Sequence, residues 1–292
     1  MMAQSTLVTS VEHFAYGWIT PALAFVLSAL GCLLGVYLTS RSRASSGGSR
    51  ARWLTLSAVA VGGSGTWIPH FMALLGADVP NSVVRYDLAI TGLGLGISVV
   101  AYCLGLYIAG FGRPSAAKII PAGLLTGLGL TAVYATGPLA MRVAGVVEYD
   151  PRILLMAVGA SIISATVTLW CAVVIRGTGA MLCAAVIMAL AVLSTHYTVM
   201  AAVRVELVPV PDVVSGVSLF ALLTPVCILA CLLLSILAYS TVGFSVRQNT
   251  AKEEALLRRA RDMYSVATLA RAAHSHRKRQ RDRDIATAPS QR

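Results

Sequence analysis

Residues 85–118 read RYDLAITGLGLGISVVAYCLGLYIAGFGRPSAAK, and this stretch decides the kind of fold. No charged residue occurs between Asp87 and Arg113. A spanning helix needs roughly 20 mostly apolar residues to cross ~30 Å of hydrocarbon, and this stretch is long enough. The segment therefore predicts a transmembrane helix with an acidic residue at one end and the basic residues Arg113 and Lys118 at the other.

Seven stretches of this kind follow one another along the chain. Their expected bounds are 15–39, 53–76, 86–111, 115–141, 152–175, 179–203 and 213–242. The composition agrees, because 57% of the residues are hydrophobic and 12% are charged, which is unusual for a soluble domain. The sequence therefore predicts an all-α integral membrane protein built as a bundle of seven transmembrane helices.

The charged residues between these stretches sort onto two faces. Nineteen of the 23 basic residues fall in the first, third and fifth connections and in the tail after Thr241. The opposite face carries Arg85, Arg142, Arg152 and Arg204 together with Glu12, Asp78, Asp87, Glu148, Asp150, Glu206 and Asp212. Basic residues are retained on the cytoplasmic side during insertion, so we expect the N-terminus outside and the C-terminus inside.

The net charge of +11 has a membrane explanation. Most of it lies beside the expected inner leaflet, where anionic lipid is a closer partner than nucleic acid. The N-terminus lacks the basic start and cleavage site of a signal peptide, so the first helix is expected to remain as an anchor. All six cysteines lie within apolar stretches, which favours buried apolar side chains over disulfides or metal ligands.

A repeat appears at the expected outer ends of the second, fourth and sixth helices. These segments read GTWIPHFMALL (65–75), LTAVYATGPLAM (130–141) and LSTHYTVMAAV (193–203). Aligning them places His70, Tyr134 and His196 in register, at intervals of 64 and 62 residues. Each interval equals one inward and one outward crossing, so the repeating unit is a helix pair. Repeats in membrane proteins often place a shared site at their interface.

The repeated segments resemble the MHYT domain, a bacterial seven-helix membrane sensor module named for a recurring Met-His-Tyr-Thr motif. The resemblance covers residues 10–243, and its best copy is His-Tyr-Thr at 196–198 followed by Met200. It implies a multi-pass protein of the bacterial plasma (inner) membrane that acts in signal transduction. It also implies an outward-facing copper site that senses a diatomic gas (O2, CO or NO) or the redox state.

The sequence departs from the family pattern at several motif positions. Pro69, Val133 and Thr195 stand where the motif has its first Met, and Tyr134 replaces a histidine in the second copy. Only the third copy keeps a histidine with Met four residues later, at His196 and Met200. A copper site built on this pattern would therefore have fewer ligands than the full motif supplies.

Imidazole and thioether groups suit copper, and the thioether favours Cu(I). The expected metal ligands are His70, His196, Met200, Met72, Met141 and His13. Tyr134, Tyr197, Arg142 and Arg204 are expected to lie next to the ligands without binding the metal. Polar groups inside a membrane are by default functional candidates. A neutral His or Tyr near a helix end can instead satisfy hydrogen bonds between helices, and that interpretation stays open.

Arg142 and Arg204 each lie eight residues after an aligned motif position, and Asp78 takes this place in the first copy. One interpretation is a ring of ion pairs that gates access to the motif layer. The other is that these side chains are helix-end residues reaching the membrane interface.

The sequence predicts three segments, a sensor domain over 10–243, an amphipathic cytoplasmic helix over 244–273 and a basic disordered tail over 274–292. The helix is expected to bind anionic lipid at the inner leaflet or a cytoplasmic signalling protein. No output domain is expected within the chain, so a sensed signal would pass to a separate partner.

No Ser-His-Asp or Cys-His set and no intramembrane carboxylate pair is evident, so we do not expect an enzyme. The leading hypothesis is the copper-based sensor. A second is a bis-His haem protein in electron transfer that uses His70 and His196. A third is a small transporter, which the lack of intramembrane acids disfavours.

Overall fold

The computed structural model describes residues 7–10, 17–74, 76, 78, 84–143, 145–207, 215–218, 221–222, 224–236, 238–239 and 257. The chain divides into two compact units, residues 1–238 and residues 239–292. Apart from Leu257, the tail segments expected at 244–273 and 274–292 lie outside the described residues, as does His13. All helices and strands named below belong to the first unit.

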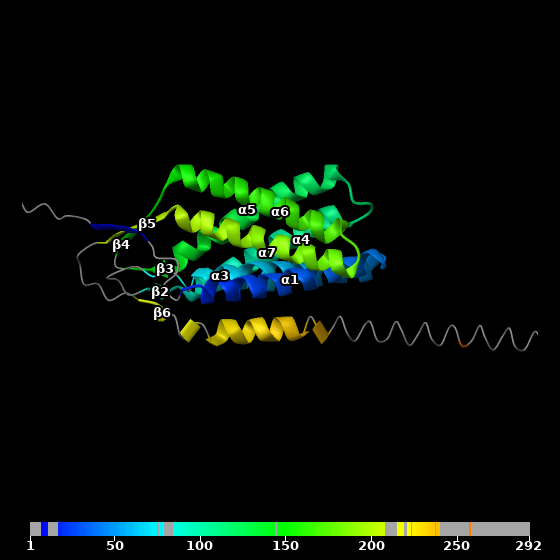
Figure 1. Ribbon diagram of the computed structural model, residues 1–292, viewed down its shortest axis with the longest axis horizontal. Coiled ribbons are helices and arrows are strands. Elements are labelled where there is room, and N and C mark those ends of the chain that lie inside the picture. Colours follow the sequence, from blue (N-terminus) through cyan, green and yellow to red (C-terminus); the bar gives the residue numbers. More distant parts are fainter. Residues whose placement is uncertain are drawn as a thin grey trace, which may run out of the picture. The chain divides into compact units, whose positions relative to one another are not determined.

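Five helices are long and apolar enough to cross a membrane, so the chain is a multi-pass membrane protein (Figure 1). They are α1 Ile19–Arg43, α4 Leu88–Gly110, α5 Ala116–Ala140, α6 Pro151–Val174 and α7 Thr178–Ala201. Each coincides within a few residues with one of the expected spans. The apolar lengths and the charged ends of these segments are therefore sufficient to locate them.

The second expected span, 53–76, is a continuous helical segment with a changed winding in its middle. It comprises α2 Gly47–Val59, the π-helix η1 Ala60–Trp67 and α3 Ile68–Leu74. The seventh expected span, 213–242, is described as a helix at Thr224–Ile236, which is shorter than the five spanning helices. A π-helix has wider turns than an α-helix and often marks a functional region.

Small residues let the neighbouring helices approach η1 closely. A Cβ placed on Gly31 of α1 would lie 2.5 Å from the carbonyl carbon of Ser64. The Ser28 hydroxyl donates to the Gly65 carbonyl at 2.6 Å, and the Ser98 hydroxyl of α4 donates to the Gly62 carbonyl at 2.7 Å. These interhelical bonds satisfy backbone oxygens of η1 in the apolar interior, where close packing and hydrogen bonds drive association.

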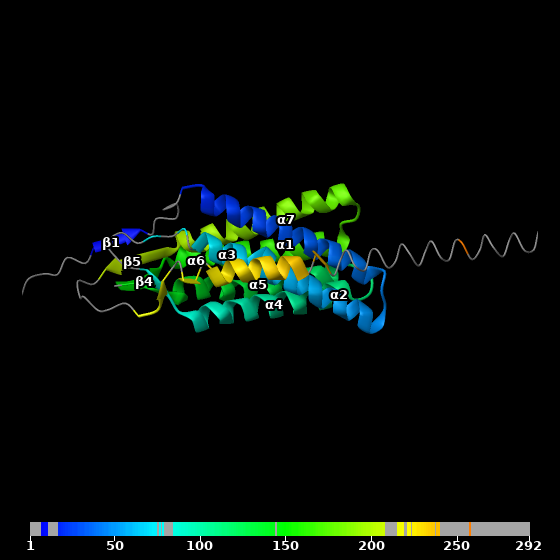
Figure 2. The same ribbon diagram turned by 90° about the horizontal axis from the view of Figure 1, so that it is seen from below.

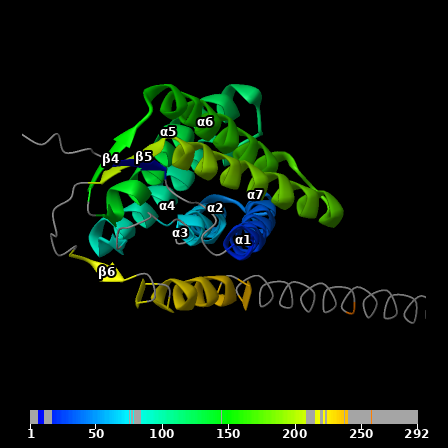
Figure 3. The same cartoon turned by 60° about the vertical axis from the view of Figure 1, so that its left-hand side comes forward.

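The helices form a closed ring in which each helix packs on its neighbours in chain order (Figures 2 and 3). The order is α1, the segment α2–η1–α3, α4, α5, α6 and α7, and α7 returns to pack against α1. The helix Thr224–Ile236 approaches the outside of η1, since a Cβ on Gly63 would lie 3.0 Å from Leu233 Cδ2. The interior of the ring holds one continuous apolar core.

Two small antiparallel sheets, which the sequence analysis did not predict, connect the helices at one end of the ring (Figure 1). One has the order β1-β5-β4, formed by β1 Leu7–Ser10, β5 Val203–Leu207 and β4 Gly145–Tyr149. The other has the order β3-β2-β6, formed by β3 Met141–Arg142, β2 Arg85–Tyr86 and β6 Val217–Ser218. The expectation of a purely α-helical chain was therefore incomplete, because these strands are too short to dominate the local sequence pattern.

Candidate functional site

His70 of α3 and His196 of α7 meet inside the ring near its sheet end. Their Nδ1 atoms are 2.7 Å apart, and their ring centroids are 4.8 Å apart at a steep interplanar angle. Each residue is 2% exposed. One Nδ1 must carry the hydrogen and donate it while the other accepts, so the pair forms a buried imidazole–imidazole hydrogen bond.

Tyr134 of α5 completes a three-residue cluster at this position. Its ring lies edge-on to His70, with 5.1 Å between ring centroids. Its hydroxyl donates to the Val192 carbonyl of α7 at 3.4 Å. The three residues that align in the repeat therefore converge on one point from three different helices.

Gly137 lies one turn after Tyr134 and makes room for the His70 ring. A Cβ at this position would lie 2.8 Å from His70 Nε2 and 3.1 Å from Cε1. The Nε2 atom is buried and has no hydrogen-bond partner among the described residues. A buried polar atom of this kind calls for an explanation such as a ligand or an unseen water.

Gly137→Ala should displace the His70 ring, because the added methyl group has no space beside Nε2. We expect a loss of about 1–3 kcal/mol of unfolding free energy, which is typical of overpacking. Gly159→Ala in α6 is the matched control, since its Cβ would meet nothing within 4 Å. Thermal unfolding of both purified variants measures the difference, and equal stability of the two would contradict the tight contact.

Three methionines expected as ligands are buried in the apolar core that contains the cluster. Met72, Met141 and Met200 are 3%, 5% and 1% exposed. Met200 follows His196 by one helical turn on α7, and Met141 pairs with Tyr86 between β3 and β2. Across the described ranges no group of three or more His, Cys, Asp or Glu could hold a metal ion. A metal here would depend on imidazole and thioether groups.

Four more aromatic side chains lie in or against the same core, of which Tyr197 was expected beside the ligands and Trp67, Phe71 and Tyr86 were not. Phe71 stacks on Trp67 at 5.6 Å and meets Tyr86 edge-on at 5.8 Å between ring centroids. Tyr197 lies edge-on to His196 at 5.0 Å. Trp67 Nε1 donates to the Thr91 carbonyl at 3.2 Å, which ties η1 to α4. Nothing in the sequence pattern pointed to Tyr86, because it lies outside the repeated segments.

Direct contact between the two imidazoles bears on the haem hypothesis. A haem iron bound by both rings needs its macrocycle between them. Rings joined by a 2.7 Å hydrogen bond leave no space for a macrocycle and would have to separate. A ligand at His70 Nε2, which is buried beside Gly137 and has no partner among the described residues, would not require the two rings to separate.

Part of the helical ring matches a known protein family. The family MHYT, described as a bacterial signalling protein N-terminal repeat, matches residues 63–122, which include His70 and the whole of α4. The chain belongs to the MHYT family. This confirms the family suggested by the register of His70, Tyr134 and His196.

Two curated relatives from Pseudomonas aeruginosa match over 198 residues, or 66% of the chain. The cyclic di-GMP phosphodiesterase NbdA is 32% identical, and the bifunctional diguanylate cyclase/cyclic di-GMP phosphodiesterase MucR is 26% identical. The chain spans 25% of the length of the first and 29% of the second. No solved structure matches the chain.

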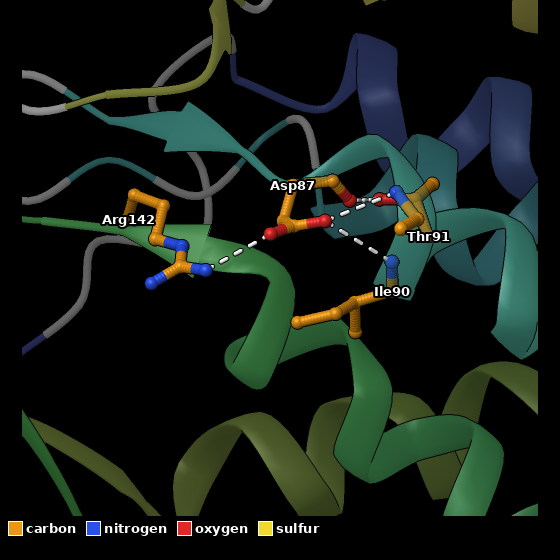
Figure 4. Close-up of polar contacts among 5 residues, drawn as sticks. Asp87, Ile90, Thr91 and Arg142 are labelled. Carbon is orange, nitrogen blue, oxygen red and sulfur yellow. Dashed lines mark hydrogen bonds and ion pairs between the residues drawn. The ribbon is translucent and has the colours of Figure 1, made fainter.

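Arg142 and Arg204, which follow the MHYT motif positions, form ion pairs at the sheet end. Arg142 bonds to Asp87 at 2.9 Å and Arg204 to Asp150 at 3.4 Å (Figure 4 shows the first pair). Both arginine side chains are more than half exposed. Hydrogen bonding to Arg142 lowers the pKa of the Asp87 carboxyl, with a further contribution from the Ile90 amide.

The two aspartates occupy equivalent places in the MHYT repeat. Asp87 caps α4 by accepting from the amides of Ala89 and Ile90, and Asp150 caps α6 in the same way. The Asp87 amide donates to the Ala140 carbonyl and the Asp150 amide to the Ala202 carbonyl, both at 2.9 Å. Each arginine therefore joins the end of one helix to the start of the helix before it in the chain, α5 to α4 and α7 to α6. Neither contacts the histidine pair in any recorded bond, so the ion pairs link repeats at the surface.

Proposed function

We propose that this chain is a sensory module of the bacterial inner membrane in which His70 and His196 hold a copper ion. The observation that carries the proposal is the contact between these two imidazoles within an apolar core, with His70 Nε2 unpartnered by any described residue. A polar pair buried between membrane helices is costly to keep, which favours a functional role. Membership of a signalling family supports sensing over catalysis.

The donor set favours Cu(I). His70 and His196 would bind it, with Met200 as the preferred thioether and Met72 and Met141 as further candidates. Soft thioether and imidazole groups select Cu(I) over Mg²⁺ or Ca²⁺. When bound, Cu(I) would supply an electron-rich centre that binds a diatomic gas (O2, CO or NO) or changes its oxidation state.

The hydrogen bond between the imidazoles suits a ligand role for His70. If His70 binds through Nε2, its Nδ1 stays free to keep the bond to His196 Nδ1, and binding of the same ion by both imidazoles would require this bond to open. Metal-bound histidines usually donate their second nitrogen in this way, which orients the ring. Burial of the pair limits access of water, and the edge contact with Tyr134 and the close approach of Gly137 hold the His70 ring in place.

This function is tested on full-length protein purified under reducing, copper-replete conditions. Metal analysis should find stoichiometric copper, and the Cu(I) form should give a carbonyl stretching band in the infrared spectrum under CO. A Soret band together with haem iron would contradict the copper sensor and support the electron-transfer hypothesis. Absence of both metals would leave the histidine pair as an interhelical hydrogen bond and would overturn the proposal.

We also propose seven crossings with the N-terminus outside, so that the sheets and the histidine pair face outward. The five acidic residues of the described chain all lie at the sheet end, and seven of its eleven basic residues lie at the opposite end. This distribution supports retention of the basic end in the cytoplasm. Reporter tags at residues 1 and 292 should appear in opposite compartments, and tags on the same side would contradict the orientation.

We propose further that the signal leaves through a cytoplasmic partner. Both relatives act on cyclic di-GMP by name, which makes cyclic di-GMP turnover the first output to examine. Cells expressing the chain should change their cyclic di-GMP content when copper or nitric oxide is added. The His196→Ala variant should not respond, and an equal response from both would separate this output from the histidine pair.

A further inference from the structure

Two arginines at the end of the ring opposite the sheets cap the ends of other helices. Arg43, the last residue of α1, donates from Nη2 to the carbonyls of Ala172 at 2.7 Å and Ile175 at 3.2 Å. Arg50 of α2 donates from Nη2 to the carbonyls of Gly110 and Gly112. The guanidinium groups therefore lie at the carboxyl ends of α6 and α4, where the helix dipole favours a cation.

Capping leaves much of each guanidinium group unused. The recorded bonds of both arginines come from Nη2 alone. The Nε atoms of both are buried and have no hydrogen-bond partner in the part of the chain that the structure describes. A guanidinium group has five donors in a fixed fork, so each arginine keeps donors for a further acceptor.

The positive charge at this end is not balanced by carboxylates. Arg43 donates to the carbonyl of Ile175, the residue before Arg176. Arg50 lies in the first turn of α2, which follows the end of α1 at Arg43, so three guanidinium groups lie at this end of the ring. The acidic residues among the described positions lie at the sheet end, in or beside the strands and the caps of α4 and α6. The carboxyl end of a helix carries roughly half a negative charge. The ends of α4 and α6 together therefore neutralise only about one of the three positive charges.

We propose that Arg43, Arg50 and Arg176 bind a phosphate-bearing anion at the arginine-rich end of the ring. Guanidinium forks match phosphate oxygens in pairs, and charge-assisted bonds of this kind are about twice as strong as neutral ones. The site lies at the ends of spanning helices, the depth at which lipid headgroups meet the protein. The phosphate can come from an anionic lipid headgroup or from a soluble phosphate compound, and both present the same chemistry.

The experiment compares lipids on the detergent-solubilised full chain by native mass spectrometry. Phosphatidylglycerol should bind in preference to phosphatidylcholine, and Arg176→Gln should reduce that preference about fivefold, the effect of roughly one surface cation. Arg176 is exposed and forms no hydrogen bond or ion pair with the residues that the structure describes, so this variant should fold normally. A double variant, Arg43→Lys with Arg50→Lys, keeps the charge but removes the fork and should also weaken binding.

A control removes two charges elsewhere at this end, one more than Arg176→Gln removes. Arg52→Gln with Arg113→Gln removes two exposed basic residues and should leave the preference for phosphatidylglycerol unchanged. In a second arm, inorganic phosphate should raise the melting temperature of the wild type but not of Arg176→Gln if the ligand is a soluble phosphate. An equal fall of the phosphatidylglycerol preference in the control would overturn the site. So would an unchanged preference in both test variants together with no effect of inorganic phosphate on the melting temperature.

Discussion

Replacing His196 by alanine should remove most of the copper that the chain binds under reducing conditions. His196 is one of two imidazoles in the buried pair, and its loss leaves His70 with a thioether at best. Mutation of groups that merely support a ligand typically costs 10–100-fold in metal affinity, so loss of a ligand should cost roughly 100-fold or more. Competition with a Cu(I) chelator measures the change.

Three further variants sharpen this experiment. Met200→Leu should weaken binding of Cu(I) more than of Cu(II), because a thioether is a soft ligand. Tyr134→Phe is the control, since the tyrosine hydroxyl donates to the Val192 carbonyl at 3.4 Å and is not needed as a ligand. Tyr134→His places an imidazole at the second repeat position and should tighten binding. Stoichiometric copper in a His70→Ala, His196→Ala double variant would refute the assignment.

Replacing Gly31 by alanine should destabilise the whole ring. The added Cβ would lie 2.5 Å from the Ser64 carbonyl carbon, and it would press equally on the Gly65 amide. These are backbone atoms of η1, which cannot rotate aside as a side chain can. We expect a loss of about 3 kcal/mol of unfolding free energy or more, at the upper end of overpacking effects. Unfolding of the purified protein in detergent micelles measures it.

Gly96→Ala in α4 is the matched control for this substitution. A Cβ at Gly96 would meet nothing within 4 Å, so the variant should stay within about 0.5 kcal/mol of the wild type. The pair separates a contact effect from the general preference of helices for alanine over glycine. If Gly31→Ala were as stable as Gly96→Ala, the close approach of α1 to η1 would not exist.

The positions of the spanning helices follow from sequence-local properties. The uncharged stretch between Asp87 and Arg113 marks α4 without reference to any other part of the chain, and the same holds for α1, α5, α6 and α7. The register of the repeat can also be read from the sequence, because it requires only three similar segments and their spacing. It was enough to predict that His70, Tyr134 and His196 belong together, and the structure brings them together.

Other features depend on contacts between distant segments. The strand VRVEL (203–207) alternates in polarity and GVVEY (145–149) does not, and each is short and lies within a predicted helix end or loop. Their pairing joins residues about sixty positions apart. The packing of the π-helix η1 likewise involves Gly31, Ser28 and Ser98 from two other helices. The sequence of residues 60–67 does not predict these contacts.

The sequence by itself determined that this is a multi-pass membrane protein of the MHYT family, with His70 and His196 at matching places in a repeat. Tertiary structure decided that their Nδ1 atoms meet at 2.7 Å, that Gly137 leaves space at Nε2, and that Arg142 pairs with Asp87 at the surface. The reason is rotational. A helix that is apolar on every side carries little information about which face turns inward, so its side-chain contacts are settled when neighbouring helices pack.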